Sequence, residues 1–373
     1  MTEKKRRGRP RQAEVARLAG VSQTTVSLVL GGNKQGIVIH EDTRRRVLEA
    51  ARTLGYVPDP AARRLAAAQN NLLGVFSFTA TFPTDPAHSY YPFLVGVERE
   101  AAARGFDLVL FTGSSTGGAG AEAPGALERV RLADGCLLFG RHVPTGPLRR
   151  LVEDGFPLVH VGRRDEVEGL TWVGADYVAA SAEVVRHLVA AGHRRVVLVR
   201  EDDDAPASTD REAGFRQGLA AAAGGEGAGG DQGVEGDQGA GGEKGVEGAV
   251  VRLRAPAEEL TADWVVAQRA AGVTAFVAEE TDTGAAWRAL RGAVARAGLR
   301  APDEVSLALL GSPPPDLPAD GEATGFDIPR AELGAAAVRA LTDLLAGRRP
   351  GGTLARCAFR PGSTTGPPPT ATT

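Results

Sequence analysis

Near its N-terminus the chain has three short segments with apolar side chains at helical spacing, Gln12–Ala19, Gln23–Leu30 and Glu41–Leu54. Apolar residues three or four positions apart share one face of a helix, so each segment predicts an amphipathic helix. Gly20 and Gly55 follow two of these segments, at the position where helices commonly end in a left-handed turn. The segments predict a small three-helix unit over residues 12–57.

Two helices joined by a tight Gly-containing turn and closed by a third form a helix-turn-helix. In that plan the second helix enters the major groove of DNA, with its N-terminal side chains nearest the base edges. Here those positions hold short hydrogen-bonding side chains, which suit contacts to bases or phosphates: Ser22, Gln23, Thr24, Thr25 and Ser27. Taken alone, Ser and Thr at a helix start serve equally well as helix caps.

From residue 72 onward, near-continuous apolar runs alternate with amphipathic stretches. The runs predict strands at 72–78, 107–111, 135–139, 158–161, 195–199, 275–278 and 305–310, and the stretches between them predict helices at 92–104, 179–191 and 283–297. This alternation indicates parallel sheets covered by helices. A core over 72–360 is longer than one such sheet usually needs, so we expect two α/β lobes.

Three other segments lack a pattern that would bury an apolar face. Residues 58–70 predict a short helix with Pro60 in its first turn, which is marginal alone because it offers a core only Leu65. Residues 223–248 are rich in Gly, Ala, Glu, Asp and Gln and predict a disordered surface insertion. The Pro- and Thr-rich segment 361–373 is expected to be a loose tail.

The net charge of −3 hides an asymmetry along the chain. Residues 1–66 hold 14 Lys and Arg against 6 Asp and Glu, a net of +8, whereas the remainder holds 29 against 40, a net of −11. A basic head on an acidic body indicates that the head meets a polyanion such as nucleic acid. The Arg-rich segment 1–11 predicts a disordered arm that contacts phosphates, although Arg7–Pro10 also resembles a minor-groove reader.

Composition and motifs exclude several other classes of protein. The sequence has no apolar run long enough to span a membrane and no secretory signal, so we expect a cytoplasmic protein. Cys136 and Cys357 lie in apolar surroundings and are expected to be buried free thiols. No dinucleotide loop, phosphate loop or nucleophile turn is present, and the six histidines lack metal-ligand spacing. We therefore expect no enzyme activity, no cofactor and no metal.

Three ordered motifs within about 65 residues resemble the LacI/GalR family of bacterial transcription regulators. They are the helix-turn-helix stretch Glu14–Ser27, the third helix and its exit at Thr43–Pro58, and the hinge-helix stretch Ala62–Leu65. The resemblance continues through the core at residues 92–102, 185–193, 211–215, 302–306 and 329–334.

The resemblance implies a DNA-binding headpiece, a hinge helix and a periplasmic-binding-protein-like core whose two Rossmann-like lobes clasp a small effector. It also implies a homodimer that reads a pseudo-palindromic site in double-stranded DNA, most often as a repressor. In that family the hinge helix folds on specific DNA and its leucine wedges into the minor groove. Leu65 matches that leucine, with Ala62 and Arg63 beside it.

For the effector, the resemblance implies Arg211, which matches an arginine that holds effector groups, and gives weaker support to Arg163 and Glu279. Several positions depart from the family, since Leu28 stands where the second helix usually has Arg, and hydroxyl partners of sugars are missing from the core. A simple sugar is therefore not assumed. An effector-independent, nucleoid-type DNA-binding protein stays an alternative.

Overall fold

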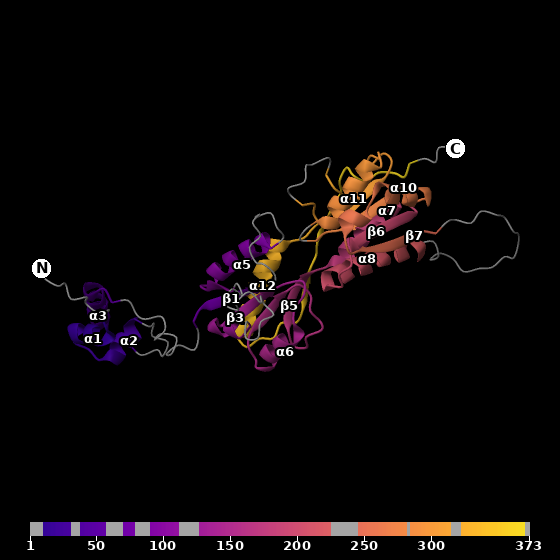
Figure 1. Ribbon diagram of the computed structural model, residues 1–373. Coiled ribbons are helices and arrows are strands. Elements are labelled where there is room, and N and C mark those ends of the chain that lie inside the picture. The colour runs from indigo at the N-terminus through magenta and orange to yellow at the C-terminus, as the bar shows by residue number, and fades with distance from the viewer. Residues whose placement is uncertain are drawn as a thin grey trace, which may run out of the picture. The chain divides into compact units, whose positions relative to one another are not determined.

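A computed structural model of the chain describes residues 10–30, 38–56, 70–78, 90–111, 127–224, 245–281, 284–314 and 322–369 (Figure 1). The chain divides into two compact units, Met1–Asn71 and Leu72–Thr373, which we describe separately as the headpiece and the core. Most of the predicted arm 1–11 and nearly all of the predicted hinge helix 58–70, with Ala62, Arg63 and Leu65, lie outside the described residues.

The headpiece contains the three predicted helices with the predicted bounds, α1 (Gln12–Ala19), α2 (Gln23–Leu30) and α3 (Glu41–Leu54). One residue from each helix forms the centre of its apolar core, and Val15, Val26 and Val47 are fully buried. Gly20 and Gly55 end α1 and α3 in the left-handed region, at φ 65° and 62°, where a side chain would be strained. The helix-turn-helix prediction is confirmed.

The first lobe of the core is built on a six-stranded parallel sheet in the order β11-β5-β4-β3-β1-β2. Its strands are β1 (Leu72–Ser77), β2 (Asp107–Phe111), β3 (Gly135–Phe139), β4 (Leu158–Val161), β5 (Thr171–Ala175) and β11 (Thr353–Ala355). The helical elements of this lobe are α5 (Tyr91–Ala103), the 3₁₀ turn η3 (Leu127–Leu132), α6 (Thr145–Glu153) and α12 (Arg330–Leu345).

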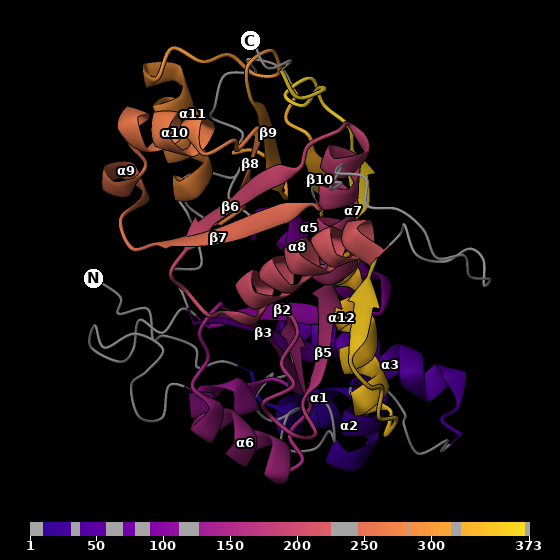
Figure 2. The same ribbon diagram turned by 90° about the vertical axis from the view of Figure 1, so that its right-hand side faces the viewer.

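Helices α5 and α12 of the first lobe lie side by side in both views (Figures 1 and 2). Their close approach depends on two glycines: a Cβ on Gly96 would lie 1.8 Å from the carbonyl oxygen of Ala331, and one on Gly334 would lie 2.1 Å from that of Phe93. Because the obstructing atoms are backbone, neither position accepts a side chain without moving the helices. These glycines therefore fix α12 against the lobe.

The second lobe is built on a four-stranded parallel sheet in the order β7-β6-β8-β9. Its strands are β6 (Arg195–Glu201), β7 (Glu247–Leu253), β8 (Ala275–Glu279) and β9 (Ser306–Leu310), and a separate antiparallel pair joins β10 (Gly325–Asp327) to β12 (Ala358–Arg360). Its helices are α7 (Tyr177–Ala190), α8 (Pro206–Gly224), α9 (Pro256–Glu259), α10 (Ala262–Ala270) and α11 (Ala285–Arg296).

Alternate residues of the central strand β6 point to opposite faces of the second sheet. Val196 and Leu198 pack in the cluster that includes α7 and α8 residues, whereas Val197 and Val199 pack in the cluster that includes Trp287 of α11. Figure 2 shows α7 and α8 on one face and α10 and α11 on the other. Both faces of the sheet are covered, which explains why its strands read as continuous apolar runs.

In the described part of the core, the chain passes between the lobes at three places: after β5 at Asp176, between β10 and α12 at residues 328–329, and between β11 and β12 at residues 356–357. Segments far apart in sequence therefore meet where the lobes join. The predicted strands and the three predicted core helices are all present, within two residues of their expected bounds.

Two of the predicted loose segments differ from the structure. Residues 225–244 of the predicted insertion 223–248 lie outside the described residues, but its ends are too wide, since Gly224 belongs to α8 and Glu247 begins β7. The loose tail predicted for 361–373 is wrong for residues 361–369. Thr364 is buried and makes two hydrogen bonds with Leu307. Its backbone carbonyl accepts from the N–H of Leu307 at 2.8 Å, and its hydroxyl donates to the carbonyl of Leu307 at 2.7 Å.

Candidate functional site

The start of α2 presents the side chains that the sequence nominates for DNA contact. Gln23, Thr24 and Ser27 are exposed, while Val26 and Val29 of the same helix are buried. Exposed polar side chains at the N-terminal end of this helix have the placement that readout in a major groove requires.

Ser22 and Thr25 serve the fold of this helix directly. The hydroxyl of Ser22 accepts a hydrogen bond from the backbone N–H of Thr25 at 3.1 Å, so Ser22 is the N-cap that the sequence predicts. The two hydroxyl oxygens lie 2.9 Å apart and are hydrogen-bonded to each other. Both readings of Ser22, a cap and a DNA contact, therefore share one side chain, and only the cap is observed here.

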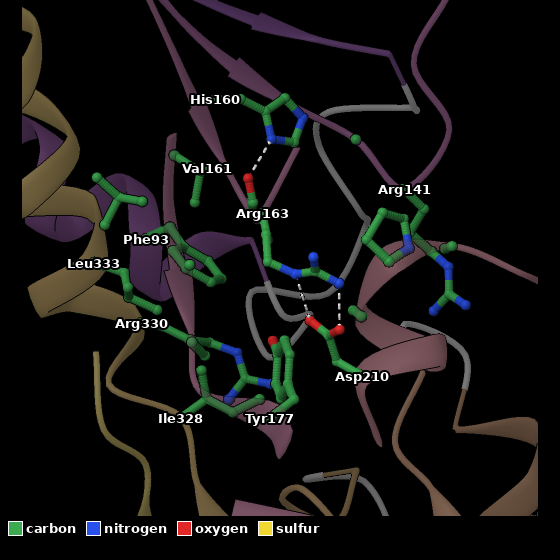
Figure 3. Close-up of a pocket in the computed structure, with 18 of the residues that line it drawn as sticks. Phe93, Arg141, His160, Val161, Arg163, Tyr177, Asp210, Ile328, Arg330 and Leu333 are labelled. Atoms are coloured by element: carbon green, nitrogen blue, oxygen red, sulfur yellow. Dashed lines mark hydrogen bonds and ion pairs between the residues drawn. The ribbon is translucent and has the colours of Figure 1, made fainter. Parts of the chain in front are cut away.

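In the core, a pocket with a cavity volume of about 120 Å³ lies between the two lobes (Figure 3). A single water needs about 10–15 Å³ on this kind of measure, so the space suits a small organic molecule. An apolar wall is formed by aromatic and aliphatic side chains, and charged side chains line the rest. The larger apolar and aromatic residues are Tyr90, Phe93, Val161, Val173, Tyr177, Ile328 and Leu333.

Three charged residues of the pocket follow the carboxyl ends of parallel strands. Arg141 comes after β3, Arg163 after β4, and Glu280 after β8. In open parallel sheets this edge is where ligands bind, because the loops that leave it are free to carry side chains into a crevice. The arrangement follows directly from the topology of the two sheets.

Of the three effector residues that the sequence nominates, Arg163 and Arg211 line this pocket together. Arg163 projects from the first lobe and donates from Nε to Oδ2 of Asp210 at 3.0 Å and from Nη2 to Oδ1 (Figure 3). These hydrogen bonds raise the pKa of the Arg163 guanidinium. The forked pair joins the first lobe to α8 of the second lobe.

Arg211 projects from α8 and is buried. Its Nε donates to the carbonyl of Leu310 at 2.9 Å, its Nη1 donates to the carbonyl of Ala207 at 3.2 Å, and its guanidinium carbon lies 4.0 Å from the centre of the Tyr177 ring. This cation–π contact and the carbonyl bonds fix the guanidinium at the pocket wall.

Glu279, the third nominated residue, is fully buried and does not line the pocket, whereas the next residue, Glu280, does. The Glu279 carboxyl accepts from the hydroxyl of Ser208 through Oε1 and lies 3.9 Å from Arg211 Nη1, and its Oε2 is without a hydrogen-bond partner among the described residues. Burial raises the pKa of Glu279 above its ordinary value of 4.5. Glu279 therefore contacts Ser208 and the pocket residue Arg211 without lining the pocket itself.

Two further arginines complete the contacts between the lobes. Arg141 of the first lobe pairs with Asp203, which follows β6 of the second lobe, at 2.7 Å. Arg330, at the start of α12, pairs with Glu280, which follows β8. Asp210, Glu280, Arg141 and Arg330 were not predicted from the sequence, although the positions of Glu280 and Arg141 directly after apolar parallel strands could have indicated them.

Among the other groups at the pocket, burial lowers the pKa of His160 to about 3, so its imidazole is neutral near pH 7. Its Nδ1 lies 2.9 Å from the carbonyl oxygen of Gly162. Burial also raises the pKa of the Tyr177 phenol. In the described ranges, no group of three or more His, Cys, Asp or Glu side chains could hold a metal ion. Cys136 and Cys357 are free and buried, as predicted.

A helix-turn-helix headpiece on the same chain as a two-lobed α/β core with a polar pocket between its lobes defines a class of bacterial regulatory proteins. Residues 13–59 match the family model of bacterial regulatory proteins of the lacI family. Residues 80–226 match the periplasmic binding proteins and sugar binding domain of the LacI family, and residues 185–365 match a periplasmic binding protein-like domain. The chain therefore carries a lacI-family helix-turn-helix domain followed by periplasmic-binding-protein-like core domains.

Among similar proteins is the HTH-type transcriptional regulator CelR of Thermobifida fusca, which is 33% identical over 219 residues. That match covers 58% of this chain and 63% of the relative, so the chain spans less than two thirds of the relative's length. A solved complex of CelR with cellobiose is 26% identical, with a TM-score of 0.57, and covers 95% of this chain and 100% of that one.

The solved lac repressor dimer bound to operator and the anti-inducer ONPF has a TM-score of 0.69 at 18% identity, with 96% of this chain and 100% of that chain covered. At this identity the likeness establishes the fold alone. The predicted architecture, a helix-turn-helix headpiece followed by a two-lobed periplasmic-binding-protein-like core with parallel sheets, is thereby confirmed. Across the described part of the chain, no helix is both long and apolar enough to cross a membrane.

Proposed function

We propose that the protein is a sequence-specific DNA-binding transcription regulator, acting as a repressor, whose operator affinity is modulated by a small molecule bound between the two lobes of the core. One observation carries this proposal: the chain combines a capped, exposed helix start in the headpiece with a charged pocket between the lobes of the core. The pocket favours a ligand-responsive regulator over an effector-independent nucleoid protein, because the latter has no use for such a pocket.

For DNA, the proposed contacts are Gln23, Thr24 and Ser27 as readers of base edges, with Ser22 and Thr25 at the helix start near phosphates. The exposure of Gln23, Thr24 and Ser27 supports this assignment. Ala62, Arg63 and Leu65 are proposed as the hinge contact in the minor groove, on the family resemblance alone, since they lie outside the described residues. A homodimer on a pseudo-palindromic site follows from the same resemblance.

For the effector, Arg163 and Arg211 are proposed as direct contacts, and Glu279 as a residue that holds Ser208 and Arg211 in place. The solved CelR–cellobiose complex, a structure similar to this chain, supports a small-molecule ligand for this core. We propose that binding changes how the lobes close, alters the geometry of the dimer and thereby shifts the hinge between folded and unfolded states. The protein would act in the cytoplasm, without a cofactor and without catalysis.

Selection of DNA from a random pool by the full-length protein, followed by gel-shift titration at physiological salt, tests this function. We expect enrichment of a two-fold symmetric site bound at least about a thousandfold more tightly than random DNA. Equal binding of the selected and scrambled sites would rule out a sequence-specific regulator. A screen for small molecules that change affinity for the selected site then tests the effector role.

A further inference from the structure

The pocket between the lobes is lined by more positive than negative side chains. Five arginines line it, Arg141, Arg163, Arg164, Arg211 and Arg330, against the two carboxylates Asp210 and Glu280. His160 adds no positive charge near pH 7, because burial lowers its pKa to about 3. A guanidinium presents five N–H donors and no acceptor, so these walls are rich in donors.

Two of these arginines lack a carboxylate partner at hydrogen-bond distance among the described residues. Arg164 is 4% exposed, donates to the carbonyls of Gly140 and Arg141 at 2.7 and 2.6 Å, and its buried Nε has no hydrogen-bond acceptor, with the Glu166 carboxylate 3.7 Å away. Arg211 is equally buried and donates to carbonyls, with its nearest carboxylate oxygens 3.8 and 3.9 Å away on Glu280 and Glu279. Buried guanidinium groups whose nearest carboxylate oxygens lie beyond hydrogen-bond distance, at 3.7–3.9 Å, favour an added anion.

A carboxylate of the protein itself already binds one of the pocket arginines. Asp210 binds the guanidinium of Arg163 in the forked geometry that arginine uses for any carboxylate or phosphate. Arg163 belongs to the first lobe and Asp210 to the second, so separation of the lobes breaks this pair and opens Nε and Nη2 of the arginine to another anion, while Nη1 stays paired with Asp165 of its own lobe. The Arg163 side chain is 33% exposed, which leaves it accessible from the pocket.

We propose that the ligand of this pocket is a small molecule bearing a carboxylate or phosphate group, which replaces Asp210 on Arg163. The proposal rests on the assignment of this pocket as the effector site and names the chemical class of the effector. Phe93, Leu333 and Tyr177 cover the uncharged part of the ligand, while Arg163 and Arg211 hold the anion. Because the anion and Asp210 compete for one guanidinium, ligand binding and the Arg163–Asp210 contact between the lobes exclude each other.

Matched pairs of probes test this on the full-length protein. Thermal unfolding and calorimetry are measured with glucose, glucose 6-phosphate, gluconate and inorganic phosphate at constant ionic strength, because salt screens charge interactions. We expect a rise in Tm with at least one anionic probe and none with glucose. The phosphate and carboxylate probes separate the two possible anions. No stabilisation by any anionic probe, or equal stabilisation by glucose, would overturn the proposal.

Two substitutions make the test specific. Asp210→Asn removes the internal competitor and the repulsion, so the Kd for the anionic probe should fall about tenfold, whereas Arg163→Gln should raise it by about the same factor. Asp154→Asn is the matched control, since Asp154 pairs with Arg131 and neither lines the pocket. Weaker anion binding by Asp210→Asn would overturn the exchange. DNA affinity is measured separately, so loss of sequence-specific DNA binding would contradict the proposed function without altering this result.

Discussion

Arg141 of the first lobe donates two hydrogen bonds to Oδ2 of Asp203 in the second lobe, from Nε at 3.0 Å and from Nη2 at 2.7 Å. The same Nη2 donates to the hydroxyl of Ser208 at 3.0 Å, and that hydroxyl donates to Glu279. The contact therefore connects a loop of one lobe, through the start of α8, to the end of β8 in the other. Any change in lobe closure must alter this chain of hydrogen bonds.

Asp203→Asn should loosen the contact between the lobes. Burial pushes the pKa of Asp203 up, but the Ala205 N–H and the Arg141 guanidinium outweigh it, so the pKa lies below its ordinary value and the carboxylate is charged near pH 7. Both side chains are only 20% exposed, so loss of the charge should cost the closed form about 1 kcal/mol, roughly a fivefold shift towards open lobes. Hydrogen–deuterium exchange of residues 203–211 should accelerate, while Asp154→Asn leaves it unchanged. Identical exchange in both variants would refute this role.

Glu279→Gln should change how stability depends on pH. Because the folded state raises the pKa of Glu279, the protonated carboxyl contributes stability that is fully present below pH 4.5 and is lost as pH rises through the folded pKa. Glutamine keeps the neutral form at every pH. The free energy of unfolding, measured with urea, should therefore rise in the variant relative to the natural protein as the pH increases above about 4.5, with the smallest difference at the acid end. A difference independent of pH would show that folding does not raise the pKa of Glu279.

Features that depend on local periodicity were predictable from the sequence. The three headpiece helices, their left-handed glycines and the Ser22 cap follow from residues within one or two turns of each other. The edge strand β7 was missed because it is largely exposed and carries no continuous apolar run, and β5 because Thr171–Ala175 is short and contains Gly174.

The pairing of charges in the pocket could not be predicted, since it depends on how the two lobes meet. Arg163 and Arg211 could be nominated from the resemblance, but their partners lie up to 47 residues away for Arg163 and 99 for Arg211. Asp210 stands directly before Arg211 in the sequence, and nothing local indicates that it faces the other lobe. Glu279 and Glu280 are adjacent residues of the same type, yet Glu279 at the end of β8 is buried in the core and Glu280, just after the strand, lines the pocket.

Removal of residues 361–373 should destabilise the second lobe, because part of this segment is bonded to its sheet. The imidazole of His193 is buried, with Nε2 2.9 Å from both the carbonyl of Gly366 and the hydroxyl of Ser306, and Thr364 is bonded to Leu307 through backbone and side chain. At about 1 kcal/mol for each lost hydrogen bond, we expect the free energy of unfolding to fall by about 2–4 kcal/mol. Urea unfolding measures this. Removal of residues 370–373 alone is the control, and equal stability of both truncated chains would contradict the prediction.

Substitutions on the headpiece should separate sequence readout from general attraction to DNA. Gln23→Ala and Thr24→Ala remove exposed hydrogen-bonding groups at the start of α2 without touching the Ser22 cap, so the selected DNA site should change at a few base pairs, each worth about 1–3 kcal/mol. Arg44→Ala removes an exposed charge from α3 and should weaken binding to all sequences similarly, while lowering the salt slope by about one. Selection from random DNA and gel shifts at several salt concentrations measure both effects. If the Gln23 and Thr24 variants select the same site as the natural protein, these side chains do not read the bases.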